Sequence, residues 1–445
     1  MKMRCFFAVL LSVTLASSVF GQDVETRMKD LEDTSRSQQK TIEEQQKQID
    51  ELKDVLDASK TEAAPPSGES SPGPETSKPT GLFGGAALTN PYISLIFNGW
   101  YYASDLSQPE IDARTIPGFT TETPENRTKG FNLESAELFL FAPVDPYFNL
   151  YVTIPVTEEG AEVEEAYFVT TSLPAGVQVK GGKFLSGFGR INGQHPHSWD
   201  FVDVPLNYQA FIGSEGMAEK GVQVTYLPSL PVYTILGVEV LQGENDLLFN
   251  PEGDTPYAFT AFAKASVDVS ENSTVLFGPS FITGKARIST VAEDTFFSGR
   301  SDLFDFEFVY KWKPSRTRSA IIQSEYLYRR QNGDLTEFSS STTDPLKRVQ
   351  DGIYTQGLYQ LGRWRIGARY DVLELFKHEY DLAGEQQEFG ERPWRATAAV
   401  EFNPSEFSRI RLQYNRDNSA ENGQINNELF FQVLLGIGAH AAHTF

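Results

Sequence analysis

The fold is decided by the end of the chain, LFFQVLLGIGAHAAHTF, residues 429–445. Side chains of a β-strand alternate between two faces, so residues two apart in this stretch share a face. In water, an apolar strand of this length at a sheet edge would aggregate, whereas a closed barrel in a bilayer needs one lipid-facing side. The stretch therefore predicts the last strand of a transmembrane β-barrel; a strand of a β-sandwich is the alternative. The predicted lipid-facing residues are Leu429, Phe431, Val433, Leu435, Ile437, Ala439 and Ala441.

The same alternation recurs from residue 92 onward and predicts an all-β, antiparallel barrel of about sixteen strands; fourteen or eighteen also fit. Phe304, Phe306 and Phe308 share one face of such a strand, against Asp305 and Glu307 on the other. Charges that repeat on the second face indicate a watered lumen and not a packed core. The predicted strands start near Tyr92, Leu133, Phe148, Val163, Val177, Val222, Tyr233, Tyr257, Thr274, Leu303, Ala320, Ile353, Trp364, Trp394, Ile410 and Leu429.

The connections between these strands alternate in length. Short turns, most of them with proline, follow the even strands, at 142–146, 172–176, 227–231, 270–273, 313–315, 361–362 and 403–406. Longer connections follow most odd strands, near 106–130, 185–219, 243–256, 284–302, 330–350, 375–392 and 416–427, with a short one near 157–161. Outer-membrane barrels have short periplasmic turns and long outer loops. An even strand count would place both ends of the barrel in the periplasm.

Three segments precede the predicted barrel at 91–445. Residues 1–21 have the charged start, apolar core and small cleavage-site residues of a secretory signal peptide. Residues 22–60 repeat apolar and polar seam positions at spacings of four and three, which predicts a periplasmic coiled coil, with a lone solvated helix as the alternative. Residues 61–90 are rich in Pro, Ser and Gly and predict a linker. Because the only cysteine, Cys5, lies in the signal peptide, we expect no disulfide in the mature chain.

Composition excludes several classes of function. A net charge of -22 argues against nucleic acid or anionic lipid as a partner. No internal run of 18 apolar residues is available for a transmembrane helix. No nucleophile elbow, metalloprotease helix or phosphate-binding loop occurs, so we expect neither an enzyme nor a cofactor.

The segment GGKF…FGRIN…HPHSWDFVDVP within residues 181–205, GSEG at 213–216 and the ending GAHAAHTF resemble Gram-negative porin-like outer-membrane proteins. Some of those proteins are labelled phosphate-selective-porin-like or zinc-regulated TonB-dependent receptors. The resemblance implies a barrel that passes small solutes and a terminal Phe445 that signals to the barrel assembly machinery. It also implies a third outer loop that folds into the barrel and narrows it. The coiled coil predicts oligomerisation and leaves dimer and trimer open; a trimeric barrel would make a homotrimer the natural expectation. The stretch before the first strand is too short for the plug domain of a TonB-dependent receptor.

Two sets of residues are candidates for a site in the lumen. Arg365, Arg369, Arg395, Arg409 and Arg411 fall on three adjacent predicted strands and predict a basic patch on one wall. Asp200, Asp203 and Glu215, with Glu219, are expected across the pore, where opposite charges would orient polar solutes; pairing of the arginines with Asp371 and Glu401 is the alternative. His195 and His197 with Asp200 and Asp203 form a weaker candidate for zinc, against a purely structural role in the loop.

The function that the sequence predicts is a porin for passive diffusion of small hydrophilic solutes. One alternative is substrate-specific uptake of a metal complex or a phosphate-like anion. Another is a structural tether in which the coiled coil holds the cell wall. The sequence leaves the solute, the pore size and the sign of ion selectivity open.

Overall fold

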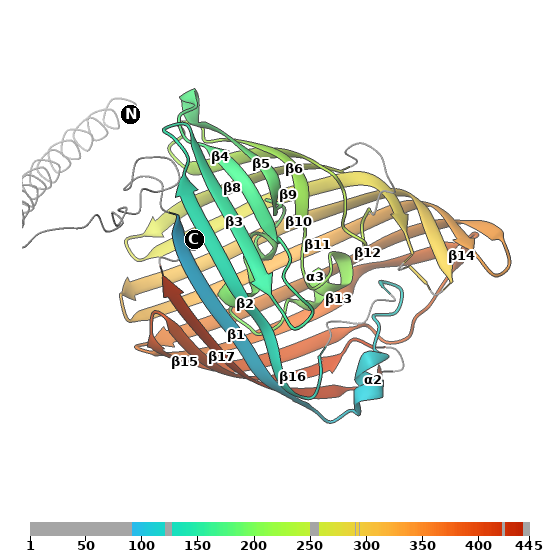
Figure 1. Ribbon diagram of the computed structural model, residues 1–445. Coiled ribbons are helices and arrows are strands. Elements are labelled where there is room, and N and C mark those ends of the chain that lie inside the picture. The colour runs from blue at the N-terminus through green and yellow to red at the C-terminus, as the bar shows by residue number, and fades with distance from the viewer. Residues whose placement is uncertain are drawn as a thin grey trace, which may run out of the picture. The chain divides into compact units, whose positions relative to one another are not determined.

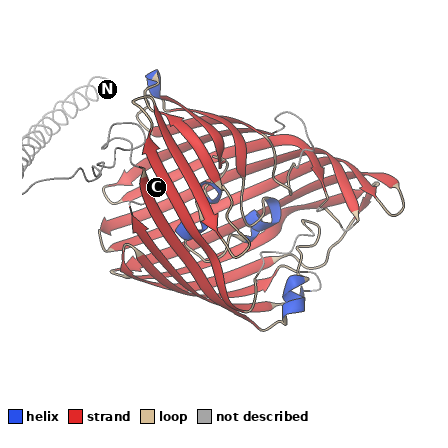
Figure 2. Cartoon of the chain, in the orientation of Figure 1, coloured by secondary structure: helices blue, strands red, loops and turns tan. Residues whose placement is uncertain are grey.

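The computed structural model describes residues 91–120, 127–249, 258–289, 291–292, 294–420 and 423–438, which form one antiparallel sheet with few helices (Figure 2). The strands are β1 (Tyr92–Ser104), β2 (Gly130–Pro143), β3 (Phe148–Val156), β4 (Glu165–Thr170), β5 (Val177–Leu185), β6 (Ala218–Tyr226), β7 (Tyr233–Leu241), β8 (Ala258–Ser270), β9 (Ser273–Ile288), β10 (Thr295–Ser315), β11 (Arg318–Glu337), β12 (Thr342–Leu361), β13 (Trp364–Leu382), β14 (Glu385–Gln386), β15 (Trp394–Ser405), β16 (Ser408–Asn418) and β17 (Asn426–Gly438). The helices are α2 (Gln108–Asp112) and α3 (Leu206–Phe211), with 3-10 turns η1 (Pro174–Gly176), η2 (Ile191–Gly193) and η3 (Pro196–Ser198).

The sheet closes on itself. Each strand pairs with the next along the chain, and β17 pairs with β1 from Ser94 opposite Gly438 to Ser104 opposite Glu428 (Figure 1). The two-residue β14 is only an arm on the end of β13, which pairs directly with β15. Leaving β14 out of the 17 strands gives a closed antiparallel barrel of 16, as the sequence predicted. Closure removes the unpaired edges that an open sheet would present.

Side chains alternate between an apolar outer face and a polar inner face. In β10, Phe304 and Phe306 are 45% and 48% exposed, whereas Asp305 and Glu307 are 4% and 1% exposed. The closing strand β17 follows the same rule, because Phe431 is exposed while its neighbours Phe430 and Gln432 are buried. A slip of one residue would turn the charged side chains outward, so the alternation fixes the register.

Short turns follow the strands after which they were predicted, but several of the predicted long loops are shorter than expected. Turns on one end of the barrel span only a few residues, for example 271–272, 316–317 and 362–363. Strands β10 to β13 have 19–21 residues, so the predicted loop at 330–350 shrinks to 338–341 and that at 284–302 to 289–294. A bilayer needs strands of about 9–11 residues. The outer halves of these hairpins carry polar side chains such as Arg330 and Asp334, so their sequence lacks the apolar alternation that identifies a lipid-facing strand.

Among the described residues, no helix combines the length and apolar character needed to cross a membrane. The predicted signal peptide (1–21), coiled coil (22–60) and linker (61–90) lie outside the described residues, as does Phe445.

Candidate functional site

The β5–β6 segment, residues 186–217, is the longest connection between two strands and forms short helical turns. Pro196 opens η3, and Pro205 immediately precedes α3, a position where its missing N–H leaves no helical bond unmade. Gly189 has φ of +64°, and a Cβ there would lie 2.1 Å from the hydroxyl of Tyr208. Only glycine therefore fits, and the local sequence folds this segment into compact turns.

One side of the β5–β6 segment packs against an apolar part of the inner face. Phe188, Tyr208 and Phe211 are fully buried in this contact, and α3 contacts β11, β12 and β13. Burying each side chain of this size contributes roughly 1.5–3 kcal/mol. The wall supplies one residue from each of seven consecutive strands, β7 to β13: Leu241, Ala258, Ile282, Leu303, Leu327, Tyr354 and Leu373.

The other side of the segment is held by ion pairs centred on Asp203, which is 1% exposed. One carboxylate oxygen lies 2.9 Å from Nη2 of Arg369, and the other lies 3.2 Å from Nη1 of Arg395 and 3.7 Å from Nη2 of Arg127. The amides of Gln413 and Asn415 donate to the same carboxylate at 2.7 and 2.8 Å. Burial alone would raise the pKa of Asp203, but the three guanidinium groups outweigh it and hold that pKa well below its usual range.

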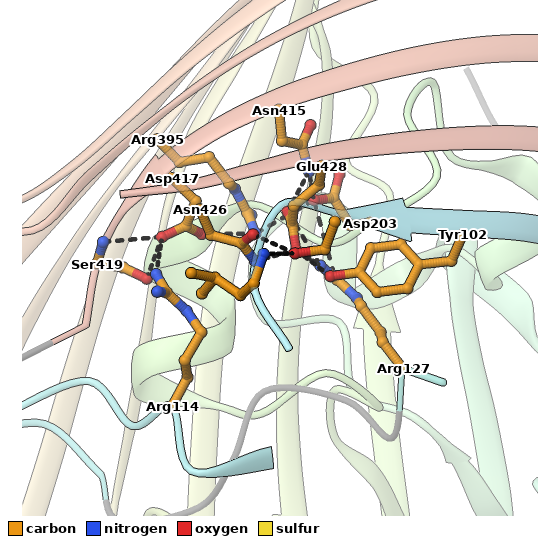
Figure 3. Close-up of polar contacts among 12 residues, drawn as sticks. Tyr102, Arg114, Arg127, Asp203, Arg395, Asn415, Asp417, Ser419, Asn426 and Glu428 are labelled. Carbon is orange, nitrogen blue, oxygen red and sulfur yellow. Dashed lines mark hydrogen bonds and ion pairs between the residues drawn. The ribbon is translucent and has the colours of Figure 1, made fainter. Parts of the chain in front are cut away.

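The contacts around Asp203 continue through a wider polar network (Figure 3). Glu428 accepts from the hydroxyl of Tyr102 at 2.8 Å and from Asn415 at 3.0 Å, and it lies 3.3 Å from Arg127. Asp417 pairs with Arg114 at 2.9 Å. Four guanidinium groups (Arg114, Arg127, Arg369, Arg395) thus face four carboxylates (Asp203, Asp371, Asp417, Glu428), so their formal charges cancel.

The remaining three of the five predicted arginines surround Glu401. Arg365, Arg409 and Arg411 lie 3.1, 3.4 and 2.7 Å from its carboxylate, and Arg365 also pairs with Asp200 at 2.6 Å. This group has three positive and two negative charges, and therefore keeps one net positive charge.

Adjacency of the five arginines on β13, β15 and β16 is as predicted, and the pairing with Asp371 and Glu401 that we gave as the alternative is present. The expected separation of Asp200 and Asp203 from the arginines across an opening is wrong, because both carboxylates contact guanidinium groups directly. A buried carboxylate without a counter-charge would cost several kcal/mol of stability. Direct contact between carboxylate and guanidinium groups is therefore favoured over their separation.

Glu215 and Glu219 lie elsewhere. Glu215 lies beside Glu162 and Glu164; partial loss of hydration, and then repulsion from these two carboxylates, raises the pKa of Glu215. Glu219 accepts the backbone N–H groups of residues 243, 244 and 245, so it fixes the start of the β7–β8 connection.

The two predicted histidines meet acids that sequence reasoning missed. His195 lies 3.2 Å from Glu164 and 3.0 Å from Glu165, and His197 lies 3.0 Å from Glu137. The expected partners Asp200 and Asp203 bind arginines instead. Adjacency in the chain was therefore a poor guide, because residues on β2 and β4 reach the histidines across space.

A second pair of residues, Arg329 on β11 and Arg348 on β12, also escaped the sequence analysis. Both are buried (0% and 1% exposed) and donate to the carbonyl oxygen of Phe119. Within the described part of the chain, no carboxylate pairs with either, and Nε and Nη1 of Arg329 and Nε of Arg348 lack a hydrogen-bond acceptor. Two buried like charges without a counter-charge are costly, so this pair is a candidate contact for an anion.

A cavity lies at the end of the barrel with the short turns. This cavity is polar, has a volume of about 480 Å³ and is lined by Gln360, Arg363, Arg365, Glu401 and Arg409, among others. Aromatic rings continue around the same end on neighbouring strands, from Tyr92 to Phe141, Tyr151 and Tyr167, with successive centroids 5.7, 5.0 and 5.0 Å apart. Charged and aromatic groups therefore occur together at this end of the barrel.

Several solved structures are similar to the chain. The outer-membrane-expressed OmpT of Vibrio cholerae covers 79% of this chain and 98% of its own, with 10% identity and a TM-score of 0.48. The outer membrane channel DcaP of Acinetobacter baumannii covers 78% and 97%, with 13% identity and a TM-score of 0.48. An anion-selective porin from Comamonas acidovorans covers 78% and 100%, with 7% identity and a TM-score of 0.49.

Sequence comparison gives a nearer relative. No protein-family model matches the chain. An uncharacterized protein of Aquifex aeolicus (strain VF5) is 41% identical over 380 residues, which is 80% of each chain. At this identity and coverage, the chain belongs to the same family as that Aquifex aeolicus protein.

Proposed function

We propose that the chain is an outer-membrane porin through which small hydrophilic solutes or ions diffuse passively. The observation that carries the proposal is the closed 16-stranded barrel with exposed Phe304 and Phe306 outside and buried Asp305 and Glu307 inside. A bilayer admits closed barrels because every backbone group is then paired. Charged inner walls suit a hydrated path.

We further propose that the β5–β6 segment folds into the lumen and narrows it. Support comes from its contacts on two walls, the apolar cluster of β7 to β13 and the ion pairs of Asp203 with Arg369 and Arg395. Solutes would then pass beside the segment, next to the charged side chains around Glu401, where Arg365 and Arg409 line a polar cavity. The arginines on β13, β15 and β16 then act on solutes mainly through the single positive charge left over around Glu401.

Planar-bilayer recording of the detergent-purified chain tests this function, with the reversal potential measured in a salt gradient. Stepwise openings are the expected result, and openings in groups of three would support the predicted homotrimer. The sign of the reversal potential reports whether the positive charge around Glu401 or the acidic outer connections dominate. Folded protein whose electrophoretic mobility changes on heating, but which never conducts, would overturn the porin proposal.

Selective uptake of small anions is a second candidate, favoured by the uncompensated pair Arg329 and Arg348. A selective channel differs from a general one in having a saturable site. Conductance that saturates with rising phosphate concentration, and no longer saturates in Arg348→Gln, is the expected result for this candidate. A linear rise in both proteins would exclude it. The predicted tether depends on residues 22–60, outside the described residues.

A further inference from the structure

A cluster of two imidazoles and three carboxylates joins the β5–β6 segment to the wall. His195 is at its centre: Nδ1 lies 3.2 Å from Oε2 of Glu164 and 4.0 Å from Oε2 of Glu137. The three ligand atoms all lie within 4.8 Å of one another. In a tetrahedral zinc site with bonds of about 2.0–2.2 Å, neighbouring ligand atoms are roughly 3.3–3.6 Å apart. Small side-chain adjustments would therefore bring these atoms to coordination distance.

The surroundings of His195 resemble the outer shell of a metal site. Nε2 of the imidazole lies 3.0 Å from Oε2 of Glu165, whose other oxygen accepts the N–H of Leu185 at 2.8 Å. A histidine that ligates a metal commonly donates its second ring N–H to a carboxylate, which fixes the tautomer and the ring orientation. With Nε2 donating to Glu165, the lone pair of Nδ1 faces Glu164 and Glu137.

A second imidazole completes the cluster. The ring of His197 stacks on that of His195 with centroids 5.6 Å apart and an interplanar angle of 7°, and its Nδ1 lies 3.0 Å from Oε2 of Glu137. The oxygen that faces His195 is therefore itself oriented by a neighbour.

The negative charge of the cluster also favours a bound cation. With neutral imidazoles, the carboxylates of Glu137, Glu164 and Glu165 give the cluster a charge of −3, and Glu137 and Glu165 are buried. A divalent ion would supply two positive charges at the point where these carboxylates converge.

We propose that Glu137, Glu164 and His195 form a binding site for a divalent transition metal of the zinc class. An imidazole nitrogen with carboxylate oxygens suits such ions, whereas calcium and magnesium prefer oxygen ligands alone. The ligands come from β2, the β3–β4 connection and the β5–β6 segment, so the ion fastens this segment to a third part of the wall. The proposal does not depend on whether the lumen conducts.

Titration of the purified full chain, made without a histidine tag, with ZnCl2 or CoCl2 tests the site. We expect one zinc per chain that is lost on chelation, and a tetrahedral cobalt absorption spectrum from the unmodified protein. His195→Gln and Glu164→Gln should each weaken binding at least tenfold. His378→Gln, a histidine of β13 outside the cluster, is the matched control and should bind as the native chain does.

Heat-modifiable mobility shows that each variant is folded, and the cobalt spectrum needs no variant at all. A native chain that binds neither metal, or zinc binding of equal affinity in native protein and His195→Gln, would overturn the proposal.

Discussion

Asp203 is the residue whose loss should most affect the docking of the β5–β6 segment. In Asp203→Asn the shape is kept, but the neutral amide no longer compensates Arg369 and Arg395, and its NH2 group faces existing donors such as Gln413 or Asn415 in either orientation. Removing one partner of a buried ion pair costs about 3–5 kcal/mol. At 1.4 kcal/mol per factor of ten, the fraction of molecules in which the segment has left the wall should increase by a factor between about 100 and several thousand.

Trypsin provides the assay, because Arg190 is the only lysine or arginine in residues 186–217. The backbone N–H of Arg190 donates a hydrogen bond to Glu325 and its Nε donates one to Gln323, both on β11. Cleavage after Arg190 therefore requires the segment to leave the wall. When reclosing is fast, the cleavage rate tracks the open population. The fragment cut after Arg190 is quantified by mass over a urea series, for native and variant chains.

Asp200→Asn is the graded control. Its carboxylate is 22% exposed and pairs with Arg365, which keeps Glu401 as a second partner, so we expect a cost of about 1 kcal/mol and roughly fivefold faster cleavage. If Asp203→Asn is cleaved after Arg190 at the native rate at every urea concentration, the ion pairs do not hold the segment and the reasoning is refuted.

Three further predictions follow from charge and from the two faces of the barrel. Because docking of the segment lowers the pKa of Asp203, the stability that Asp203 gives to docking is fully present above its ordinary pKa of about 3.9 and is lost only as pH falls below that value. Bilayer recordings should therefore show new states of higher conductance below pH 4 and none between pH 5 and 7. The raised pKa of Glu215 means that its charged form opposes docking, so Glu215→Gln should slow cleavage after Arg190 at pH 8, and faster cleavage would contradict this. Phe306→Arg places a charge on the outer face of β10 and should lower the free energy of unfolding by about 2–4 kcal/mol, measured by urea unfolding from vesicles. Ser298→Arg, on the same face in the part of the strand expected beyond the bilayer, should leave that free energy almost unchanged. Equal losses in both variants would mean that Phe306 does not lie in the lipid-facing band.

Local periodicity predicted the wall of this barrel well, for a physical reason. Lipid outside and polar groups inside impose a period of two, so Phe304 and Phe306 against Asp305 and Glu307 locate a strand and its faces together. The same logic failed in the long hairpins, because their outward-facing side chains, such as Arg330 and Asp334, are exposed and polar while Leu335 on the other face is buried. Residues 330–337 therefore read as a loop although they pair with β12.

The site was predicted less well, since its partners are set by the curvature of the closed sheet. Asp203 was expected across the pore from the arginines of β13 and β15, but it contacts them directly. Arg127, from the connection after β1, also reaches Asp203, and no sequence pattern links it to this site. Glu137 and Glu165 likewise occupy polar positions on β2 and β4, which both pair with β3, and the fold of the β5–β6 segment brings His195 and His197 to them. The one usable signal was that these acids fall on inner-face positions of otherwise apolar strands.

The contacts of the β5–β6 segment also limit the kind of constriction that we propose for it. A mobile gate has to be released at a cost near thermal energy, but this segment has an apolar anchor on β7 to β13 whose burial contributes several kcal/mol. The buried ionic contact at Asp203 is a second anchor, which fixes the position of the segment on the wall. Both must break before the segment moves as a unit, so equilibrium opening is rare. In the porin that we propose, selection would therefore come from the size and charge of the path beside a fixed segment. A metal ion at His195 would fasten the segment at a third point and make it more rigid, so chelation should increase cleavage after Arg190 in the native chain and leave it unchanged in His195→Gln.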